Sequence, residues 1–333
     1  MGQAKKSSKA GANPRPALPD SAGFATRLLA WYDRHARPLP WRENHDPYRV
    51  WVSEIMLQQT RVAAVTTHYQ LFLKSFPTVQ KLARARGPSV LAVWSGLGYY
   101  RRARMLHAAA KMVVKKYQGK LPAGSKELRA LPGIGRYTAA AIASIAHGEK
   151  IAVVDGNVER VLSRLKGKSI DGEAAWQAAQ DLLDEARPGD FNQAMMELGA
   201  TVCLPQQPRC LLCPVSPFCR ARGELAVEKK APSQRKREIR YALARRNGHV
   251  FLVQRKEDES LMPGMWELPE VPRNGTAPLL SLRHSITVTD YTVRVVEMPI
   301  PEQERGRWIA LSRVGALPLT GLARKILRRA EML

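Results

Sequence analysis

Apolar side chains recur at three- and four-residue intervals through most of the chain, which is the spacing of helices that bury one face. The pattern is nearly continuous over 21–222 and is clear from Phe24 and Leu28 onward. Asp46 followed by Pro47 is typical of an N-cap with proline at the first helical position. Prolines and glycines divide the pattern into successive helices at Pro77, Gly87, Pro88, Gly96, Pro122 and Pro132. The pattern predicts a mainly α domain over 21–226.

The pattern changes after a charged, proline-containing stretch at 227–238, which we expect to be an interdomain linker. Beyond it, segments rich in Val, Ile, Tyr and Thr with partial alternation predict strands at 239–245, 249–255, 285–296 and 306–311. The segment 319–333 follows a proline and predicts a closing amphipathic helix. We therefore expect a small α+β domain over 239–333.

The first twenty residues, 1–20, are rich in Lys, Ser, Gly, Ala and Pro, and we expect them to form a disordered basic arm. They lack the apolar region of a secretory signal, and the most apolar later run, 138–146, is too short to span a bilayer. The sequence therefore predicts a soluble cytoplasmic protein with no membrane partner, associated with the nucleoid if it is bacterial.

Charge points to a polyanionic partner. The chain has 53 Lys and Arg against 29 Asp and Glu, which gives a formal charge of +24 and a pI of about 10.3. No clean basic amphipathic helix stands out, so nucleic acid is favoured over an acidic membrane surface. The alternative is a merely soluble surface, but excess charge of this size destabilises a compact state by self-repulsion.

All the cysteines of the chain lie within 17 positions, at Cys203, Cys210, Cys213 and Cys219. They contain one Cys-x2-Cys pair, whereas structural zinc sites usually combine two such pairs, or one pair with nearby histidines. The flanking histidines, His147 and His249, are distant in sequence. Four thiolates are the complete ligand set of a [4Fe-4S] cluster, which we therefore expect. The alternative is zinc-bound or unconnected thiols.

The segment 131–139 (LPGIGRYTA) lies between a short predicted helix ending near Ala130 and a longer one from Arg136 to about His147. Gly133 and Gly135 let the backbone turn tightly and approach a ligand, and amides at the start of the second helix would face a phosphate. This is a helix-hairpin-helix grip on the DNA backbone. The alternative is a plain connection between helices.

Two carboxylates could act on a glycosidic bond, whose cleavage needs an acid for the leaving group and a carboxylate for the sugar cation. Glu54 lies inside the apolar helical segment 50–57, where desolvation would favour the protonated form. Asp155 follows the apolar run 151–154 and precedes a predicted helix. The alternatives are a solvated acid at Glu54 and a turn or capping aspartate at Asp155.

Together these segments resemble the helix-hairpin-helix DNA glycosylases, and among them the adenine DNA glycosylases of the MutY family. The matching segments keep the family's order over about 21–222 and are 39–42 (LPWR), 50–60 (VWVSEIMLQQT), 96–100 (GLGYY), 131–139, 154–158 (VDGNV), 191–199 (FNQAMMELG) and the four cysteines. The resemblance implies a six-helix-barrel glycosylase domain with a [4Fe-4S] cluster loop that shapes a phosphate-facing surface.

The resemblance also implies roles for residues. Glu54 would protonate the adenine ring, and Asp155 would stabilise or transiently bond to the sugar cation after the base is flipped. Other implied substrate contacts are Trp41, Arg42, Leu57, Tyr137 and Glu197 around adenine, Asn157 as a further substrate-binding residue, and Gln59 and Tyr99 as wedges in the base stack. Each has a plainer interpretation. Trp41 and Leu57 suit a core, Arg42 and Gln59 a solvated surface, Glu197 an exposed helix acid and Tyr99 half-buried packing.

Tyr137 separates two subfamilies, because related endonucleases that also cut the backbone carry there a lysine able to form a Schiff base. We therefore expect a monofunctional enzyme, active as a monomer on double-stranded DNA with adenine opposite 8-oxoguanine or guanine. The alternatives are a pyrimidine-specific endonuclease III-like glycosylase/lyase and a catalytically silent iron-sulfur DNA-binding module, which would need neither carboxylate.

The second domain resembles the family's C-terminal domain, which has a Nudix-like fold without the metal-binding box and recognises 8-oxoguanine. The match lies in 251–255 (FLVQR) and 264–269 (GMWELP). Where the family commonly has Phe-Ser-His, this chain has Ile286, Thr287 and Val288. Thr287 keeps a hydroxyl and Val288 loses an imidazole, so lesion recognition is expected to depend on Thr287.

Overall fold

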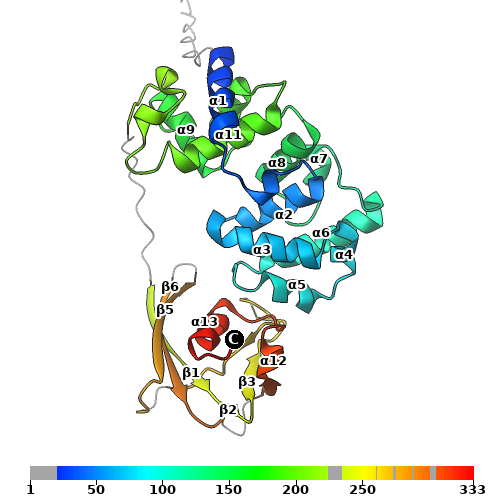
Figure 1. Cartoon of the computed structure of the whole chain (residues 1–333), viewed down its shortest axis with the longest axis vertical. Helices are drawn as coiled ribbons and strands as arrows, with labels where there is room; N and C mark the ends of the chain where they lie inside the picture. The colour runs from blue at the N-terminus through cyan, green and yellow to red at the C-terminus, as the bar shows by residue number, and fades with distance from the viewer. Residues whose placement is uncertain (1–20, 224–234, 260, 273–274, 287–288, 301–304) are drawn as a thin grey trace, which may run out of the picture. The chain divides into compact units, whose positions relative to one another are not determined.

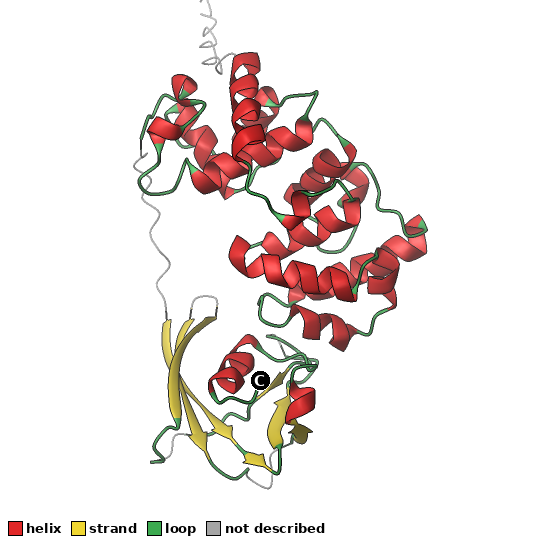
Figure 2. Cartoon of the chain, in the orientation of Figure 1, coloured by secondary structure: helices red, strands yellow, loops and turns green. Residues whose placement is uncertain are grey.

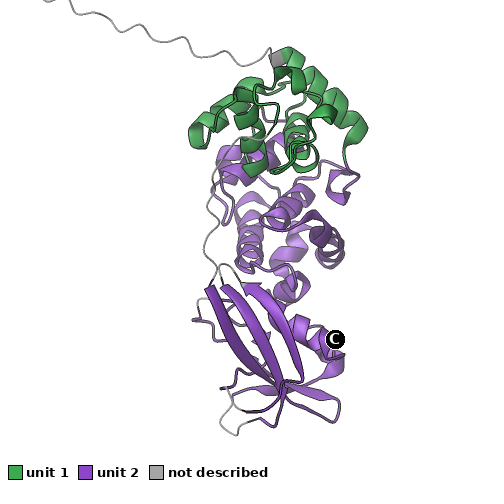
Figure 3. Ribbon diagram, turned by 90° about the vertical axis from the view of Figure 1, so that its left-hand side faces the viewer, with its two compact units in different colours: residues 1–36, 150–226 green, residues 37–149, 227–333 purple. Residues whose placement is uncertain are grey.

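The computed structural model describes residues 21–223, 235–259, 261–272, 275–286, 289–300 and 305–333. The chain divides into two compact units, one made of residues 1–36 and 150–226 and the other of residues 37–149 and 227–333 (Figure 3). Both combine segments that are distant in sequence, so neither unit coincides with the domains predicted over 21–226 and 239–333, which stay a prediction.

The first unit is helical and holds the cysteines. Its elements are α1 (Ser21–His35), α9 (Gly156–Lys166), α10 (Gly172–Leu182), α11 (Pro188–Thr201) and two 3₁₀ turns, Cys210–Leu212 and Ser216–Phe218. α1 packs on α10 and α11, and α9 packs on α11 (Figure 1). The apolar stripe of α1 that begins at Phe24 and Leu28 is fully buried against Leu162, Phe191 and Leu198. The helical period predicted this core.

The second unit begins with a set of helices. They are α2 (Pro47–Leu57), α3 (Val62–Ser75), α4 (Val79–Arg84), α5 (Gly87–Trp94), α6 (Arg101–Tyr117), α7 (Ser125–Leu128) and α8 (Arg136–His147), preceded by the 3₁₀ turn Pro40–Arg42. α2 packs against α3, α6 and α8. The predicted N-cap is confirmed, because Asp46 Oδ1 accepts from the Arg49 amide at 2.9 Å ahead of Pro47.

The rest of this unit contains two sheets (Figure 2). Its elements are β1 (Arg235–Leu243), β2 (Arg245–Arg246), β3 (His249–Gln254), β4 (Trp266–Glu267), β5 (Leu280–Ile286), β6 (Thr289–Glu297), β7 (Arg307–Ala310), α12 (Leu311–Val314) and α13 (Gly321–Arg329). One sheet has the order β1-β6-β5, with β1 and β6 parallel. In the other, β3 pairs with β2, β4 and β7. Leu252, Val293 and Ile326 lie in their common core. The predicted α+β character of this region is confirmed.

Several predicted boundaries are wrong. The strand predicted over 285–296 is the end of β5 followed by β6, which pair antiparallel with Ile286 opposite Thr289. The segment 285–296 is rich in β-branched residues throughout, so its composition did not separate the two strands. β1 begins at Arg235, inside the segment predicted to be a linker. The arm at 1–20, the first part of the linker and Thr287 lie outside the described residues.

Among the described helices, none is both long enough and apolar enough to cross a membrane.

Candidate catalytic site and cysteine cluster

The predicted site residues fall in both units. The unit of residues 1–36 and 150–226 holds Asp155, Asn157, Glu197 and the four cysteines, and the unit of residues 37–149 and 227–333 holds Trp41, Arg42, Glu54, Leu57, Gln59, Tyr99, Gly133, Gly135 and Tyr137. Thr287 lies outside the described residues.

Asp155 is the N-cap residue of α9. Its Oδ1 accepts from the amides of Asn157 and Val158, each at 2.8 Å, and its Oδ2 accepts from Asn157 Nδ2 at 3.1 Å. The capping role weighed from the sequence is therefore confirmed. Three N–H donors and the start of a helix also fix the orientation of this half-buried carboxylate and stabilise its negative charge.

A hydrogen-bonded chain links Asp155 to the cysteine region. Arg160 Nη2 donates to Asn157 Oδ1 at 2.9 Å and to the Gly199 carbonyl at 2.7 Å, and its Nε donates to the Cys203 carbonyl at 2.9 Å. Arg160 was not among the residues predicted from the sequence. Its spacing of three residues from Asn157 places the two on one helix face, but an arginine in so basic a chain carries no signal of its own.

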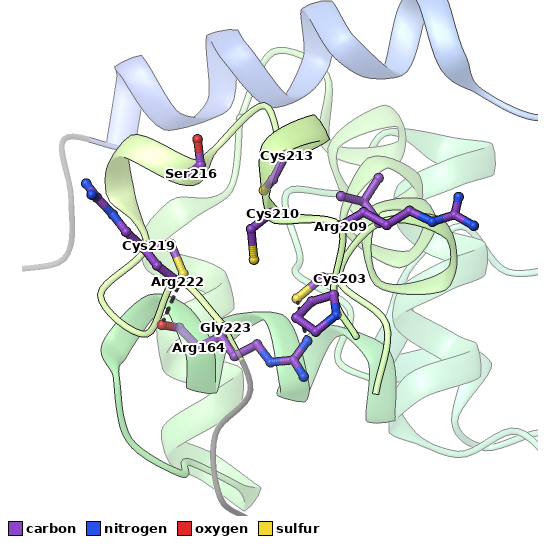
Figure 4. Close-up of a pocket in the computed structure, with 11 residues that line it drawn as sticks. Arg164, Cys203, Arg209, Cys210, Cys213, Ser216, Cys219, Arg222 and Gly223 are labelled. Carbon is purple, nitrogen blue, oxygen red and sulfur yellow. Dashed lines mark hydrogen bonds between the residues drawn. The ribbon is translucent and has the colours of Figure 1, made fainter. Parts of the chain in front are cut away.

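The four cysteines, all half-buried, line one pocket (Figure 4). Arg164 is only 4% exposed and is hydrogen-bonded to the loop that carries the cysteines. Its Nη1 donates to Cys203 Sγ at 3.2 Å and to the Leu204 carbonyl at 2.6 Å, while its own carbonyl accepts from Cys219 Sγ at 3.4 Å. Burial raises the pKa of the Cys213 thiol to about 11, and the negative potential of the other three cysteines adds to this.

The sequence left two metal centres open for these thiols, a zinc ion and a [4Fe-4S] cluster. A tetrahedral zinc site needs its ligands around one ion. Among the described residues, no group of three or more His, Cys, Asp or Glu side chains is arranged to hold a single ion. A [4Fe-4S] cube is larger and is held by four cysteine thiolates. Four cysteines around one pocket are the complete donor set of such a cluster.

The hairpin between α7 and α8 takes the predicted form. Gly133 has φ +78°, and a Cβ there would lie 2.6 Å from Met105 Cβ, so both backbone and packing require glycine. Gly135 is the N-cap of α8 with an extended backbone (φ −89°, ψ −179°). Beyond its chain neighbours, no described atom lies within 4 Å of a Cβ built on Gly135. The start of α8 is thus open to a phosphate.

Glu54 is 5% exposed on α2, which excludes the solvated alternative. The helix that carries it is fixed to the hairpin helix, because Gln58 Nε2 donates to Thr138 Oγ1 at 3.1 Å and α2 packs along α8. Tyr137, the residue before Thr138, is half-buried in the first turn of α8. The structure therefore places the predicted acid on a helix packed against the predicted DNA grip.

The residues matched to the adenine pocket differ in burial. Trp41 is buried and makes an edge contact with Tyr69, with ring centroids 5.5 Å apart. Arg42 is half-buried, and its Nη1 donates to the Arg37 carbonyl at 3.2 Å. Leu57 is half-buried at the end of α2. Glu197 is 1% exposed, so its interpretation as an exposed helix acid is wrong.

The two predicted wedge residues are exposed and share an unusual backbone. Gln59 has φ +55° and Tyr99 has φ +48°, both in the left-handed region. Tyr99 is 49% exposed, so its interpretation as half-buried packing is wrong. Residues held in this region tend to mark functional sites.

The chain matches the family model described as "HhH-GPD superfamily base excision DNA repair protein" over residues 52–185. It is 49% identical over 220 residues to the adenine DNA glycosylase of Homo sapiens, covering 62% of this chain and 40% of the relative. It is 39% identical over 214 residues to the adenine DNA glycosylase of Buchnera aphidicola (subsp. Acyrthosiphon pisum), covering 62% and 61%. The chain thus spans about half the length of such curated relatives.

Solved structures give the same fold. A thermostable thymine-DNA glycosylase superposes with a TM-score of 0.57 at 30% identity, covering 61% of this chain and 96% of that chain. A trapped endonuclease III–DNA covalent intermediate superposes with a TM-score of 0.53 at 23% identity, covering 60% and 93%, and is similar in fold alone. The hairpin between α7 and α8, the family match and these superpositions agree: the chain belongs to the HhH-GPD superfamily of base excision DNA repair proteins, and its curated relatives in that superfamily are adenine DNA glycosylases.

Proposed function

We propose that this protein is a monofunctional DNA glycosylase that hydrolyses the bond between adenine and deoxyribose where adenine is mispaired with 8-oxoguanine or guanine. The observation that carries the proposal is the buried carboxyl of Glu54 on α2, a helix packed directly against the hairpin helix α8. Burying a carboxyl disfavours its charged form, and a general acid benefits from that environment because it must hold a proton before the reaction. The relatives named adenine DNA glycosylases support the choice of base.

Glu54 would donate a proton to the adenine ring, which makes the base a better leaving group as the glycosidic bond breaks. Tyr137, Trp41, Arg42, Leu57, Asn157 and Glu197 remain the proposed contacts of the flipped nucleotide. Trp41 supplies a rigid buried wall rather than a surface platform. The proposal requires the base to leave the stack before the proton is transferred.

Asp155 would stabilise the positive charge that develops on the sugar. Its two oxygens already accept three hydrogen bonds, so the carboxylate is oriented before substrate arrives and needs little reorganisation. Water then adds to the sugar carbon and loses a proton, leaving an abasic site. Since Tyr137 has no amine, no Schiff base can form at that position, and the DNA backbone stays intact.

Cys203, Cys210, Cys213 and Cys219 would hold a [4Fe-4S] cluster. When bound, the cluster supplies four strong covalent ties that shape the loop. We propose that it acts as a structural clip and not as an electron carrier, because the loop around it presents Arg209 and Arg220 as exposed cations for a phosphate backbone.

The region from β1 to α13 is proposed to be Nudix-like and to recognise 8-oxoguanine, with Thr287 as the contact. We further propose that the protein acts as a monomer in the compartment that holds the DNA, and that its formal charge of +24 brings it to duplexes by a salt-dependent attraction.

The test is adenine release by the purified full chain under single-turnover conditions. Duplexes with adenine opposite 8-oxoguanine and opposite guanine are expected to lose adenine without strand cleavage. A guanine:thymine duplex and an oxidised-pyrimidine duplex serve as the alternatives, with borohydride trapping to detect a lyase. Release of a pyrimidine with a trapped adduct would establish the endonuclease-like alternative. Binding without release of any base would establish the silent module.

A further inference from the structure

Arg102, the second residue of α6, connects the two segments that carry the proposed wedge residues. Its Nη1 donates to the carbonyls of Ile55 at 2.9 Å, of Met56 at 2.8 Å and of Gln58. Its Nη2 donates to Thr60 Oγ1 at 3.0 Å and to the Gly98 carbonyl at 3.3 Å. One planar guanidinium thus ties the end of α2 and the following turn to the loop before α6.

These acceptors surround the two wedge residues in sequence. Gln58 and Thr60 lie on either side of Gln59, and Gly98 precedes Tyr99. The guanidinium carbon of Arg102 also lies 5.3 Å from the ring centroid of Tyr99. The guanidinium of Arg102 therefore contacts the neighbours of Gln59, the residue before Tyr99 and the ring of Tyr99.

Both wedge residues need such support because of their backbone. Gln59 and Tyr99 are not glycines and have φ of +55° and +48°, a conformation that costs free energy and persists only where the surroundings impose it. The carbonyls at the end of α2 have no partners within the helix, and Arg102 satisfies three carbonyls at or just beyond that end. A cation at a helix C-terminus is also favoured by the helix dipole.

The surroundings of Arg102 suit a fixed internal tie. The side chain is half-buried, with the Trp94 ring on another side at 5.5 Å from the guanidinium carbon to the centroid. Burial lowers the pKa of Arg102 to about 10, so the group stays charged at neutral pH. The preceding residue, Arg101, is exposed at the start of the same helix. The two arginines carry the same charge in different environments.

We propose that Arg102 is the positioning residue that holds Gln59 and Tyr99 in the geometry needed to open the base stack beside the target adenine. The inference rests on the proposed function, because the wedge role comes from it. Arg102 acts through its neighbours, because both of its Nη atoms donate to the protein, whereas Arg101 is exposed and can meet a phosphate. If Arg102 contacted a phosphate, its loss would change the salt dependence of DNA binding. If it positions Gln59 and Tyr99, its loss would change base unstacking instead.

The experiment compares Arg102→Lys, Arg102→Gln and the matched control Arg101→Gln in the full chain. Lysine keeps the charge but cannot reach five acceptors from one plane. A duplex with 2-aminopurine beside the target adenine reports unstacking by its fluorescence, independently of base release. Both Arg102 variants are expected to lose most of the fluorescence increase at saturating protein, and to slow single-turnover release by about tenfold to a hundredfold.

Two measurements, salt dependence and a mutant cycle, distinguish positioning of Gln59 and Tyr99 by Arg102 from a phosphate contact and from a general packing role. Arg101→Gln is expected to reduce the slope of log affinity against log salt by about 1, and Arg102→Lys to leave it unchanged. The slowing caused by Arg102→Lys should disappear in a Gln59→Ala/Tyr99→Ala background, since the residues it positions are then absent. A general packing defect in Arg102→Lys would persist in that background and would overturn the inference, as would wild-type fluorescence in Arg102→Lys.

Failure of the proposed function is distinguishable from failure of this inference. If the wild-type chain releases no adenine from any duplex, the function is wrong whatever the Arg102 variants do. If the wild-type chain releases adenine and unstacks the probe while Arg102→Lys does both equally well, only the positioning role is wrong. Arg102→Lys retains a cation at the end of α2, so it is the variant expected to fold even if Arg102→Gln does not.

Discussion

Arg160 Nη2 lies 2.9 Å from Asn157 Oδ1, on the side of the asparagine opposite to the Nδ2 group that donates to Asp155. The same guanidinium donates through Nε to the Cys203 carbonyl. Hydrogen bonds through Asn157 and Arg160 therefore connect the carboxylate of Asp155 to the backbone of Cys203. This connection runs entirely within one compact unit of the chain.

Replacing Arg160 by Gln should release Asn157 and loosen Asp155 without altering either directly. Groups that orient a functional ligand from behind typically contribute about tenfold to a hundredfold. We expect single-turnover adenine release to slow by about that factor, with duplex affinity changing much less. Arg27→Gln, at an exposed position on α1, is the control for lost charge and should release adenine normally. Equal rates for the two variants would show that Asp155 needs no such support.

The carboxyl of Glu54 should be required for the chemical step. Glu54→Gln preserves the shape of the side chain and removes the proton that it donates, so single-turnover adenine release should fall by at least about a hundredfold. Duplex affinity, measured in a gel-shift or anisotropy titration, should stay close to the wild-type value. Asp155→Asn is the companion variant, because asparagine also caps helices well and the α9 N-terminus should survive. Near-normal release by Glu54→Gln would remove Glu54 from the mechanism.

The two hairpin glycines should respond differently to the same substitution. Gly133→Ala forces a Cβ into the left-handed region and to within 2.6 Å of Met105 Cβ, so we expect a loss of about 1–3 kcal/mol in the free energy of unfolding. Gly135 has an extended backbone and open space around a built Cβ, so Gly135→Ala should leave the free energy of unfolding nearly unchanged. The added methyl group should weaken duplex binding, because it crowds the phosphate at the start of α8. Urea titrations and binding isotherms measure the two effects. Equal destabilisation by both would contradict this account of the hairpin.

Loss of one cysteine should weaken the cluster loop. Cys210→Ser is expected to lower the absorbance of the iron-sulfur cluster, the melting temperature and duplex affinity. Single-turnover release at saturating protein should change little, because Cys210 lies outside the connection through Arg160 and Cys203. Cys203→Ser keeps the backbone carbonyl that accepts from Arg160 Nε, so the same small change of rate is expected for it. A colourless wild-type protein without iron would refute the cluster itself.

Local signals in the sequence predicted a large part of the fold. The Asp46 cap, the hairpin at Gly133 and the apolar stripe at Phe24 each depend on residues within one helical turn, and each is where the pattern placed it. The division between β5 and β6 was missed because the segment 285–296 is rich in β-branched residues throughout, and only the pairing of the two strands shows where β5 ends and β6 begins.

The supporting residues of the site were not predictable in the same way. Arg102, Arg160 and Arg164 each donate several hydrogen bonds to backbone carbonyls, many of them distant in sequence. In a chain with 53 lysines and arginines, nothing in the sequence distinguishes these three from exposed cations. The burial of Glu54 and Glu197 was equally open, because both lie in apolar helices whose buried side is set by neighbouring elements.

His107, buried on α6, should make the stability of the protein depend on pH. Burial lowers the pKa of His107, and the nearby Lys111 lowers it further. A histidine whose folded pKa lies below its unfolded value of about 6.5 binds more protons in the unfolded state. Its neutral form therefore stabilises the fold above pH 6.5, and that stability is lost as the pH falls.

The free energy of unfolding should therefore decrease from pH 7 to pH 5, by at most about 1.4 kcal/mol per pH unit for this one group. His107→Gln should flatten the slope in urea titrations. His284 is also half-buried with a lowered pKa, so the slope that remains in His107→Gln should shrink again in the double variant. If the wild-type slope survived both substitutions, the acid sensitivity would have to come from carboxylates instead.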